Sequence, residues 1–109
     1  MKNQDPKRNR TTLLVLLALA HGKMHGYEIS KFIDTQSKGF FRMPFGSLYP
    51  ILHRLEKEKL ISAEWDDSDS LKPRKTYALT ARGRKGLEED VANHRLYNKA
   101  VNLLIPAEI

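Results

Sequence analysis

One stretch of the chain gathers hydroxyl, imidazole, guanidinium and ammonium groups at the spacing of a single helix. It begins at Ser47 and runs to about Lys59. At about 100° per residue, polar groups fall on one side and aliphatic groups on the other. The polar side holds Ser47, Tyr49, Pro50, His53, Arg54 and Lys57. These groups surround a helix N-terminus, whose free N–H groups favour anions, and they can bind phosphate oxygens and base edges.

The opposite side of this predicted helix is apolar, at Leu48, Ile51, Leu52 and Leu55. Ser47 is expected to be the N-cap. Pro50 is expected in the first turn, where backbone N–H groups have no partner within the helix to lose. Glu56 and Glu58 also point outward, so an ordinary amphipathic surface helix remains an alternative.

A second basic group follows in a predicted β-hairpin. Residues 60–65 alternate between apolar and polar in the manner of a strand, and residues 73–79 form the returning strand, with Pro73 confined to its start. The basic residues of the hairpin are Lys72, Arg74 and Lys75. The connecting loop is acidic, at Asp66, Asp67 and Asp69. Lys72, Arg74 and Lys75 are placed to lie along a nucleic-acid backbone.

Other chemistries find little support in the sequence. The absence of cysteine excludes disulfides, thiolate metal sites and a cysteine nucleophile, and it is consistent with a cytoplasmic location. His21 and His25 are four residues apart, but Gly22 and Gly26 place them in a turn and no third metal ligand is near. We find no nucleophile–base pair and no glycine-rich phosphate loop, so we expect neither an enzyme nor a cofactor.

Two further helices are predicted before the basic helix, over residues 11–20 and 27–38. The first is capped by Thr11 or Thr12, ends before Gly22 and is apolar on nearly every side. Its basic flank and apolar run also resemble a short signal peptide, but removing the run would take away the most apolar helix. The following aromatic residues are expected to be core residues: Tyr27, Phe32, Phe40 and Phe41.

Composition and length set the frame for these elements. The chain has 109 residues, of which 40% are hydrophobic and 29% charged, which suits one folded domain. Its formal net charge of +6 makes a polyanionic partner worth considering. Three helices followed by a two-stranded hairpin give the winged helix-turn-helix plan, a mainly α fold with a small β-hairpin.

A long final helix is predicted over residues 81–105, with Thr80 as its N-cap. Steps of four and three residues form a coiled-coil seam: Leu87, Val91, His94, Asn98, Val101 and Ile105. With the apolar first helix, at Leu13, Leu16 and Leu17, this seam is expected to bind a second copy of the chain. The polar step at His94 and Asn98 is expected to set alignment and leave room for an effector pocket. Packing of the seam within one subunit remains an alternative.

Three segments of the sequence resemble the PadR family of bacterial transcriptional regulators. Residues 25–29, HGYEI, are similar to its helix-two opening, and residues 46–56, GSLYPILHRLE, to its recognition helix. Residues 73–83, PRKTYALTARG, are similar to its wing and the start of its last helix. The resemblance covers about residues 12–86. It implies a dimeric, usually repressing regulator that binds inverted-repeat operators and often responds to small molecules.

The chain departs from the family pattern at three places. Phe45 stands where a proline is common, and Ser70-Leu71 where the wing often has two glycines. Its single tryptophan, Trp65, lies in the wing, so a ligand mode that needs a tryptophan in the last helix does not transfer. We expect a single domain, with the winged helix at residues 10–80 and a dimerisation helix at 81–105. A winged helix used only for protein interaction remains the alternative function.

Overall fold

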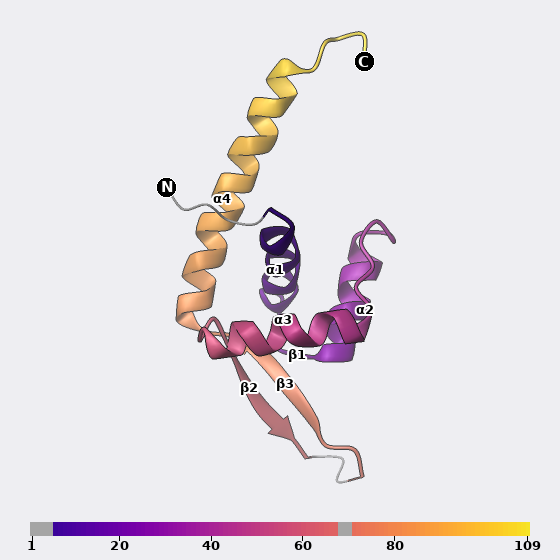
Figure 1. Ribbon diagram of the computed structural model, residues 1–109, viewed down its shortest axis with the longest axis vertical. Coiled ribbons are helices and arrows are strands. Elements are labelled where there is room, and N and C mark those ends of the chain that lie inside the picture. Colours follow the sequence, from indigo (N-terminus) through magenta and orange to yellow (C-terminus); the bar gives the residue numbers. More distant parts are fainter. Residues whose placement is uncertain (1–5, 68–70) are drawn as a thin grey trace.

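A computed structural model of the protein describes residues 6–67 and 71–109 (Figure 1). Helices α1, α2 and α3 form the body, a β-hairpin projects from one end, and α4 extends away from the other. The elements are α1 (Pro6–Leu19), β1 (Met24–His25), α2 (Gly26–Gln36), α3 (Phe45–Lys57), β2 (Ile61–Asp66), β3 (Arg74–Leu79) and α4 (Ala81–Leu104). The predicted mainly helical winged-helix fold is confirmed.

The core lies where the three helices of the body meet the base of the sheet. Leu48, Leu52 and Leu55 of α3 are fully buried, as the apolar face of the predicted helix requires. They pack with residues of every other helix in one cluster, whose further members include Val15, Ile29, Ile33, Ile61, Tyr77 and Leu87. Ile51, at the edge of the same face, is only partly buried.

Helix α1 begins earlier than the sequence predicts. It starts at Pro6, so Thr11 and Thr12 lie inside the helix and cap nothing. Proline suits a first helical turn because its φ is already helical and its missing N–H has no partner there. The apolar run supplies Val15 and Leu16, among others, to the core of the chain.

The sheet has three strands, one more than the sequence predicts. Strand β1 contains only two residues and pairs antiparallel with β3, giving the order β1-β3-β2. Met24 faces Tyr77 and His25 faces Thr76 in this pairing. The predicted turn around His25 is therefore the edge of the sheet, and it passes directly into α2 at Gly26.

Helix α3 begins two residues before the predicted N-cap. Pro44 is the N-cap, which makes Ser47 a residue of the first turn. Pro50 consequently lies in the second turn and not in the first, inside the helix. It cannot donate to the Gly46 carbonyl, but both residues are exposed, so water can satisfy that oxygen.

The hairpin and α4 follow the predicted plan with small shifts. Strands β2 and β3 pair from Ile61 with Leu79 out to Asp66 with Arg74. The loop residues Ser70 and Asp69 lie outside the described part of the chain. Thr80 is the N-cap of α4, as predicted, and its hydroxyl accepts a hydrogen bond from the Gly83 N–H at 3.0 Å.

Gly83 also explains how α4 leaves the body. A Cβ at this position would collide with the carbonyl oxygen of Leu60, so only glycine lets the first turn of α4 approach the connection between α3 and β2 this closely. The Thr80 hydroxyl donates to the Lys59 carbonyl at 2.8 Å, across the same junction. These contacts fix the direction in which α4 extends from the winged helix.

Candidate nucleic-acid interface

The outward face of α3 is exposed as the sequence predicts, with one exception. The predicted residues that lie open to solvent are Ser47, Tyr49, Pro50, His53 and Lys57. They form a strip of hydroxyl, imidazole and ammonium groups along the helix. Tyr49 keeps 53% of its surface exposed, enough for its hydroxyl and ring edge to contact a partner.

Arg54 is the exception on this face. Its guanidinium turns back toward α1, where Nη2 donates to the Thr12 hydroxyl at 3.3 Å. The side chain is partly buried, and among the described residues its Nε has no hydrogen-bond partner. Arg54 therefore ties α3 to α1 in this structure and does not extend outward like its neighbours.

The wing carries its basic groups in two different states. Lys72 and Arg74 are exposed at the start of the returning strand. Lys75 is partly exposed and is held against α3: its Nζ lies 3.5 Å from Oε1 of Glu56 on α3 and 5.7 Å from the centre of the Trp65 ring. The pair between Lys75 and Glu56 thus connects the wing to α3, and only Lys72 and Arg74 of the predicted three are fully available.

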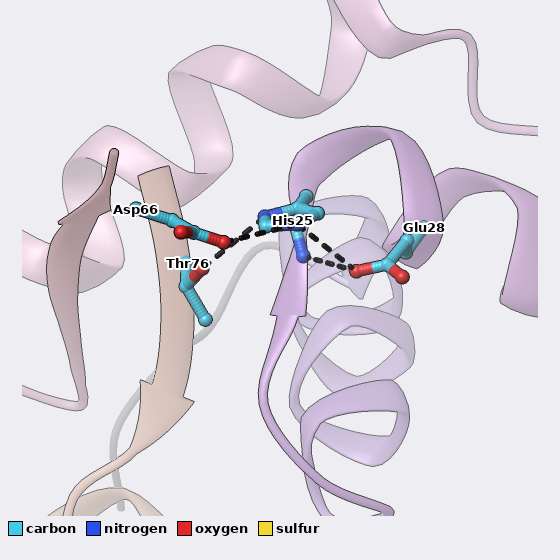
Figure 2. A network of polar contacts seen from close by, with 4 residues as sticks. All are labelled: His25, Glu28, Asp66 and Thr76. Atoms are coloured by element: carbon cyan, nitrogen blue, oxygen red, sulfur yellow. Dashed lines mark hydrogen bonds and ion pairs between the residues drawn. The ribbon is translucent and has the colours of Figure 1, made fainter. Parts of the chain in front are cut away.

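A polar network around His25 joins the start of α2 to the wing (Figure 2). The His25 backbone N–H donates to Oε1 of Glu28 at 2.8 Å. Its ring Nδ1 lies 3.2 Å from the Thr76 hydroxyl, and its Nε2 lies 3.8 Å from Oδ2 of Asp66. The histidine that the sequence assigned to a turn thus positions both strands of the wing against α2. The two-residue strand β1, which carries it, is too short to be recognised from periodicity.

An open aromatic cleft lies between α3, the start of α2 and the outer half of the wing. Its volume is about 360 Å³, and its walls include Tyr27, Phe45, Tyr49 and Trp65. Each of these four side chains keeps about half or more of its surface exposed. The sequence does not predict this cleft, because Tyr27 at the start of α2 was expected in the core.

Two of the aromatic residues expected in the core are not there. Tyr27 is 65% exposed and Phe40 is 81% exposed, whereas Phe32 and Phe41 pack against the core. Tyr27 lies two residues before the buried Ile29, about 200° around the helix, so helical spacing alone would have placed it outside. Phe40 stacks edge-on against Phe41 in the loop that follows α2.

Tyr77, on β3 beneath the cleft, is buried at 4% exposure. Burial raises the pKa of its phenol above 10.0, and the nearby Tyr49 and Glu56 raise it further. The phenol is therefore held neutral where wing and α3 meet.

The predicted partner surface divides into a buried and an exposed part. Leu16 and Leu87 are 2% and 4% exposed, so they are core residues of this chain and have almost no surface left for a second copy. Leu13 and Leu17 are partly buried, as is Val91. The outer part of the seam is exposed: His94, Asn98, Val101 and Ile105. The two polar residues of the seam meet each other, with Asn98 Nδ2 lying 3.0 Å from His94 Nε2.

Helices α1 and α4 also enclose a larger hollow of about 900 Å³. Leu14, Leu17, Phe41 and Val91 make it largely apolar, and His94 and Asn98 lie at its edge.

No helix among the described residues is long and apolar enough to cross a membrane. His21 lies against the ring of Phe32, 4.8 Å between centroids, and away from the His25 network.

Comparison with known proteins decides the family. Residues 15–89 match the family described as "Transcriptional regulator PadR-like family". The chain belongs to the PadR-like family. This PadR-like protein is also 33% identical over 84 residues to "Transcriptional regulator Rv3488" of Mycobacterium tuberculosis, covering 77% of this chain and 75% of that one. Two other curated relatives are much longer, and the chain spans 28% and 36% of their lengths.

Solved structures agree with the fold of the PadR-like chain. A transcriptional regulator from Clostridium thermocellum is 25% identical with a TM-score of 0.81, covering 97% of this chain and 100% of that one. Bacillus subtilis PadR in complex with operator DNA has a TM-score of 0.69 over 74% of this chain and 46% of that one. At 23% identity it shows a shared fold alone. The family consists of transcriptional regulators, which confirms that the chain is not an enzyme.

Proposed function

We propose that this PadR-like regulator acts in the bacterial cytoplasm as a dimeric repressor that binds an inverted-repeat operator and is released by a small molecule. The observation that carries the DNA-binding part is the joint exposure of the α3 strip and the free basic groups of the wing. The proposed DNA contacts are Ser47, Tyr49, Pro50, His53, Lys57, Lys72 and Arg74, all exposed. A helix face with a flanking basic hairpin divides the work between base edges and phosphates.

We assign a different role to two of the predicted DNA contacts. Arg54 is bound to Thr12, and Lys75 is bound to Glu56. Both side chains are directed toward another element of the chain and not outward with the α3 strip. We therefore assign both residues to holding α3 and the wing in place, and we assign the phosphate contacts of the wing to Lys72 and Arg74.

The outer half of α4 supports the dimer. Val101 and Ile105 of the seam are 36% and 49% exposed, and Tyr97, next to Asn98 in the sequence, is 70% exposed. Large apolar side chains at this exposure cost free energy in water, and a second copy crossing α4 would cover them. The proposed interface contains Leu13, Leu17, Val91, His94, Asn98, Val101 and Ile105, while Leu16 and Leu87 support it from the core.

The hollow between α1 and α4 supports an effector site. It adjoins the proposed interface and has an apolar wall with His94 and Asn98 at its edge. A small molecule bound there would alter the angle between α1 and α4, and with it the distance between the two wings of a dimer. An effector acts only through different affinities for the two arrangements.

The test is a mobility shift on unrelated duplex DNA at low salt, repeated over a range of salt concentrations. Replacing Lys72 and Arg74 with Gln should weaken binding to all sequences, and the salt slope should fall by about two units, roughly one for each phosphate contact. The matched control is Arg82→Gln with Lys85→Gln, which removes the same charge from exposed positions on α4. Equal losses of affinity and salt slope in both double variants would show that only net charge matters and that Lys72 and Arg74 make no specific contact.

The alternative function is a winged helix that contacts other proteins only. Complete failure to shift duplex DNA at low salt, with the chain folded, would favour that alternative over DNA binding. The exposed aromatic residues around the cleft would then be the first candidates for a protein contact.

A further inference from the structure

We propose that the aromatic cleft beside the outer half of the wing is a binding site for a planar aromatic anion. It lies on the face that we propose for DNA, so its regulatory effect rests on the proposed function, while binding itself does not. This site is separate from the hollow between α1 and α4: the cleft is lined by α2, α3 and the wing, and the hollow by α1, α4 and Phe41.

The shape and walls of the cleft indicate a flat apolar ligand. Its volume of about 360 Å³ lies near the lower end of small-molecule sites, which run from about 300 to 1,000 Å³. Phe45 and Tyr49 lie with ring centroids 6.1 Å apart at one wall, and Tyr27 and Trp65 belong to the same lining. Aromatic side chains from three elements favour a planar guest that can stack against them or meet their edges.

The charges around the cleft indicate an anion. Arg74 and Lys75 belong to its lining, and none of the described lining residues carries a carboxylate. Lys75 already neutralises Glu56, whereas Arg74 is exposed and can form bidentate hydrogen bonds with a carboxylate or sulfonate. The nearby carboxylates of Glu28 and Asp66 do not line the cleft; they lie 3.9 and 3.8 Å from Nε2 of His25, which does line it.

Duplex DNA is a poor occupant for this cleft. A phosphate backbone would contact Arg74 but would leave the aromatic walls against charged, hydrated groups. The exposed surface of Tyr27, Phe45 and Trp65 gains most from an apolar partner that excludes water. Arg74 and Tyr49 are nevertheless shared with the proposed DNA face, so an occupied cleft and a bound duplex compete for them.

Phe45 is the residue that makes the cleft specific to this chain. It stands where the pattern of the family that the sequence resembles commonly has a proline. Its ring lies so close to Gly26 that a Cβ at that glycine would collide with it. The ring is therefore seated over the start of α2, where it lines the cleft together with Tyr27 and Tyr49.

The experiment uses two probes that share one ring system and differ in charge. The full chain, labelled with ¹⁵N, is titrated with 8-anilino-1-naphthalenesulfonate and then with neutral N-phenyl-1-naphthylamine. Trp65 is the only tryptophan, so its indole N–H gives one isolated cross-peak. We expect this peak and the Phe45 amide to shift saturably with the sulfonate, and the neutral probe to bind several-fold more weakly.

Variants distinguish binding at this site from nonspecific binding of the probe. Phe45→Ala should weaken sulfonate binding by about tenfold, the loss expected for one aromatic contact in an apolar site. Tyr27→Ala is a second variant, since its exposed side chain contributes little to the fold. Arg74→Gln should remove the preference for the charged probe. Leu104→Ala, on the exposed end of α4, is the control and should change nothing at Trp65.

Two outcomes would overturn the proposal: no saturable shift of the Trp65 indole, or shifts that Phe45→Ala and Tyr27→Ala leave unchanged. A competition with labelled duplex then tests the regulatory consequence, and the sulfonate should displace DNA from the wild-type chain but not from Phe45→Ala. If Trp65 responds to the probe while the chain binds no duplex at all, the cleft site stands and the DNA-binding proposal fails.

Discussion

The winged-helix body and the outer half of α4 treat their apolar side chains in opposite ways. In the body, residues such as Leu48, Leu52 and Leu55 are completely buried within the chain. Beyond Val91, α4 exposes apolar residues along its length, and Leu103 and Leu104 are 81% and 82% exposed. The body therefore buries its apolar side chains within one chain, whereas the outer half of α4 is a surface without a partner in the chain. One copy of the chain is enough to stabilise the body, whereas the apolar residues of outer α4 would be covered only by a second copy.

The largest expected effect sets a core residue against a residue at the end of α4. Leu52→Ala removes a fully buried side chain and should lower the free energy of unfolding by about 2–5 kcal/mol. Leu104→Ala should change it by less than about 0.5 kcal/mol, because the side chain is exposed. Urea unfolding followed by circular dichroism, at a concentration where the chain is monomeric, measures both. Similar losses in the two variants would erase the distinction between the regions.

The second effect concerns the seam that the proposed dimer would bury. Val101→Glu with Ile105→Glu places charges at exposed positions that do not belong to the core. We expect monomers in analytical ultracentrifugation and a loss of operator affinity by a factor of about 100, since both half-sites can no longer be bound at once. The double variant should unfold like the wild-type monomer. A variant that remains dimeric would place the interface elsewhere.

The third effect distinguishes the arginine on α3 from the arginine on the wing. Arg54→Ala removes the hydrogen bond to Thr12, and stability should fall by about 0.5–1.5 kcal/mol with the salt slope of DNA binding unchanged. Arg74→Ala should do the reverse, lowering the salt slope by about one unit at unchanged stability. Thermal unfolding and binding at several salt concentrations give both quantities. A reduced slope in Arg54→Ala would return Arg54 to the DNA contacts.

Helical periodicity predicted much of this division before any coordinates. The apolar face of α3, the Thr80 cap and the exposed outer seam all depend on residues a few positions apart, which a sequence displays directly. Spacing could not show that Leu87 reaches the core, because that depends on how Gly83 lets α4 approach Leu60. The partners of Arg54 and Lys75 come from distant segments, so only the fold could show them.

The misplaced boundaries have local physical causes. Helix α1 extends back to Pro6, which is compatible with proline in a first turn. Thr11 and Thr12 are common N-cap residues, so the sequence favoured a later start. Strand β1 has two residues and exists only through its pairing with β3, so no period could indicate it. Helical spacing alone predicts that Tyr27 is exposed, and the expectation that it is a core residue came from its aromatic side chain.

The smallest effect is a pH dependence at the junction of wing and α3. Burial, followed by Tyr49 and Glu56, raises the pKa of Tyr77 above 10.0, so the folded chain favours the neutral phenol. The unfolded phenol ionises first. The stabilisation is therefore complete below about pH 10 and is lost as the pH rises through the raised pKa. Tyr77→Phe should lose less stability than the wild type in chemical unfolding between about pH 9 and pH 11. Parallel losses would show that Tyr77 does not titrate with unfolding.

The central claim is that two copies of the winged helix present α3 and the wing to one DNA site. Selection of bound duplexes from a random pool, using the full chain, tests it most directly. We expect enrichment of an inverted repeat whose half-site centres lie about 10 base pairs apart or a multiple of that spacing, and bases inserted between the half-sites should abolish binding. A pool without enriched symmetry, or binding that ignores the spacer length, would contradict a rigid dimeric reader of DNA.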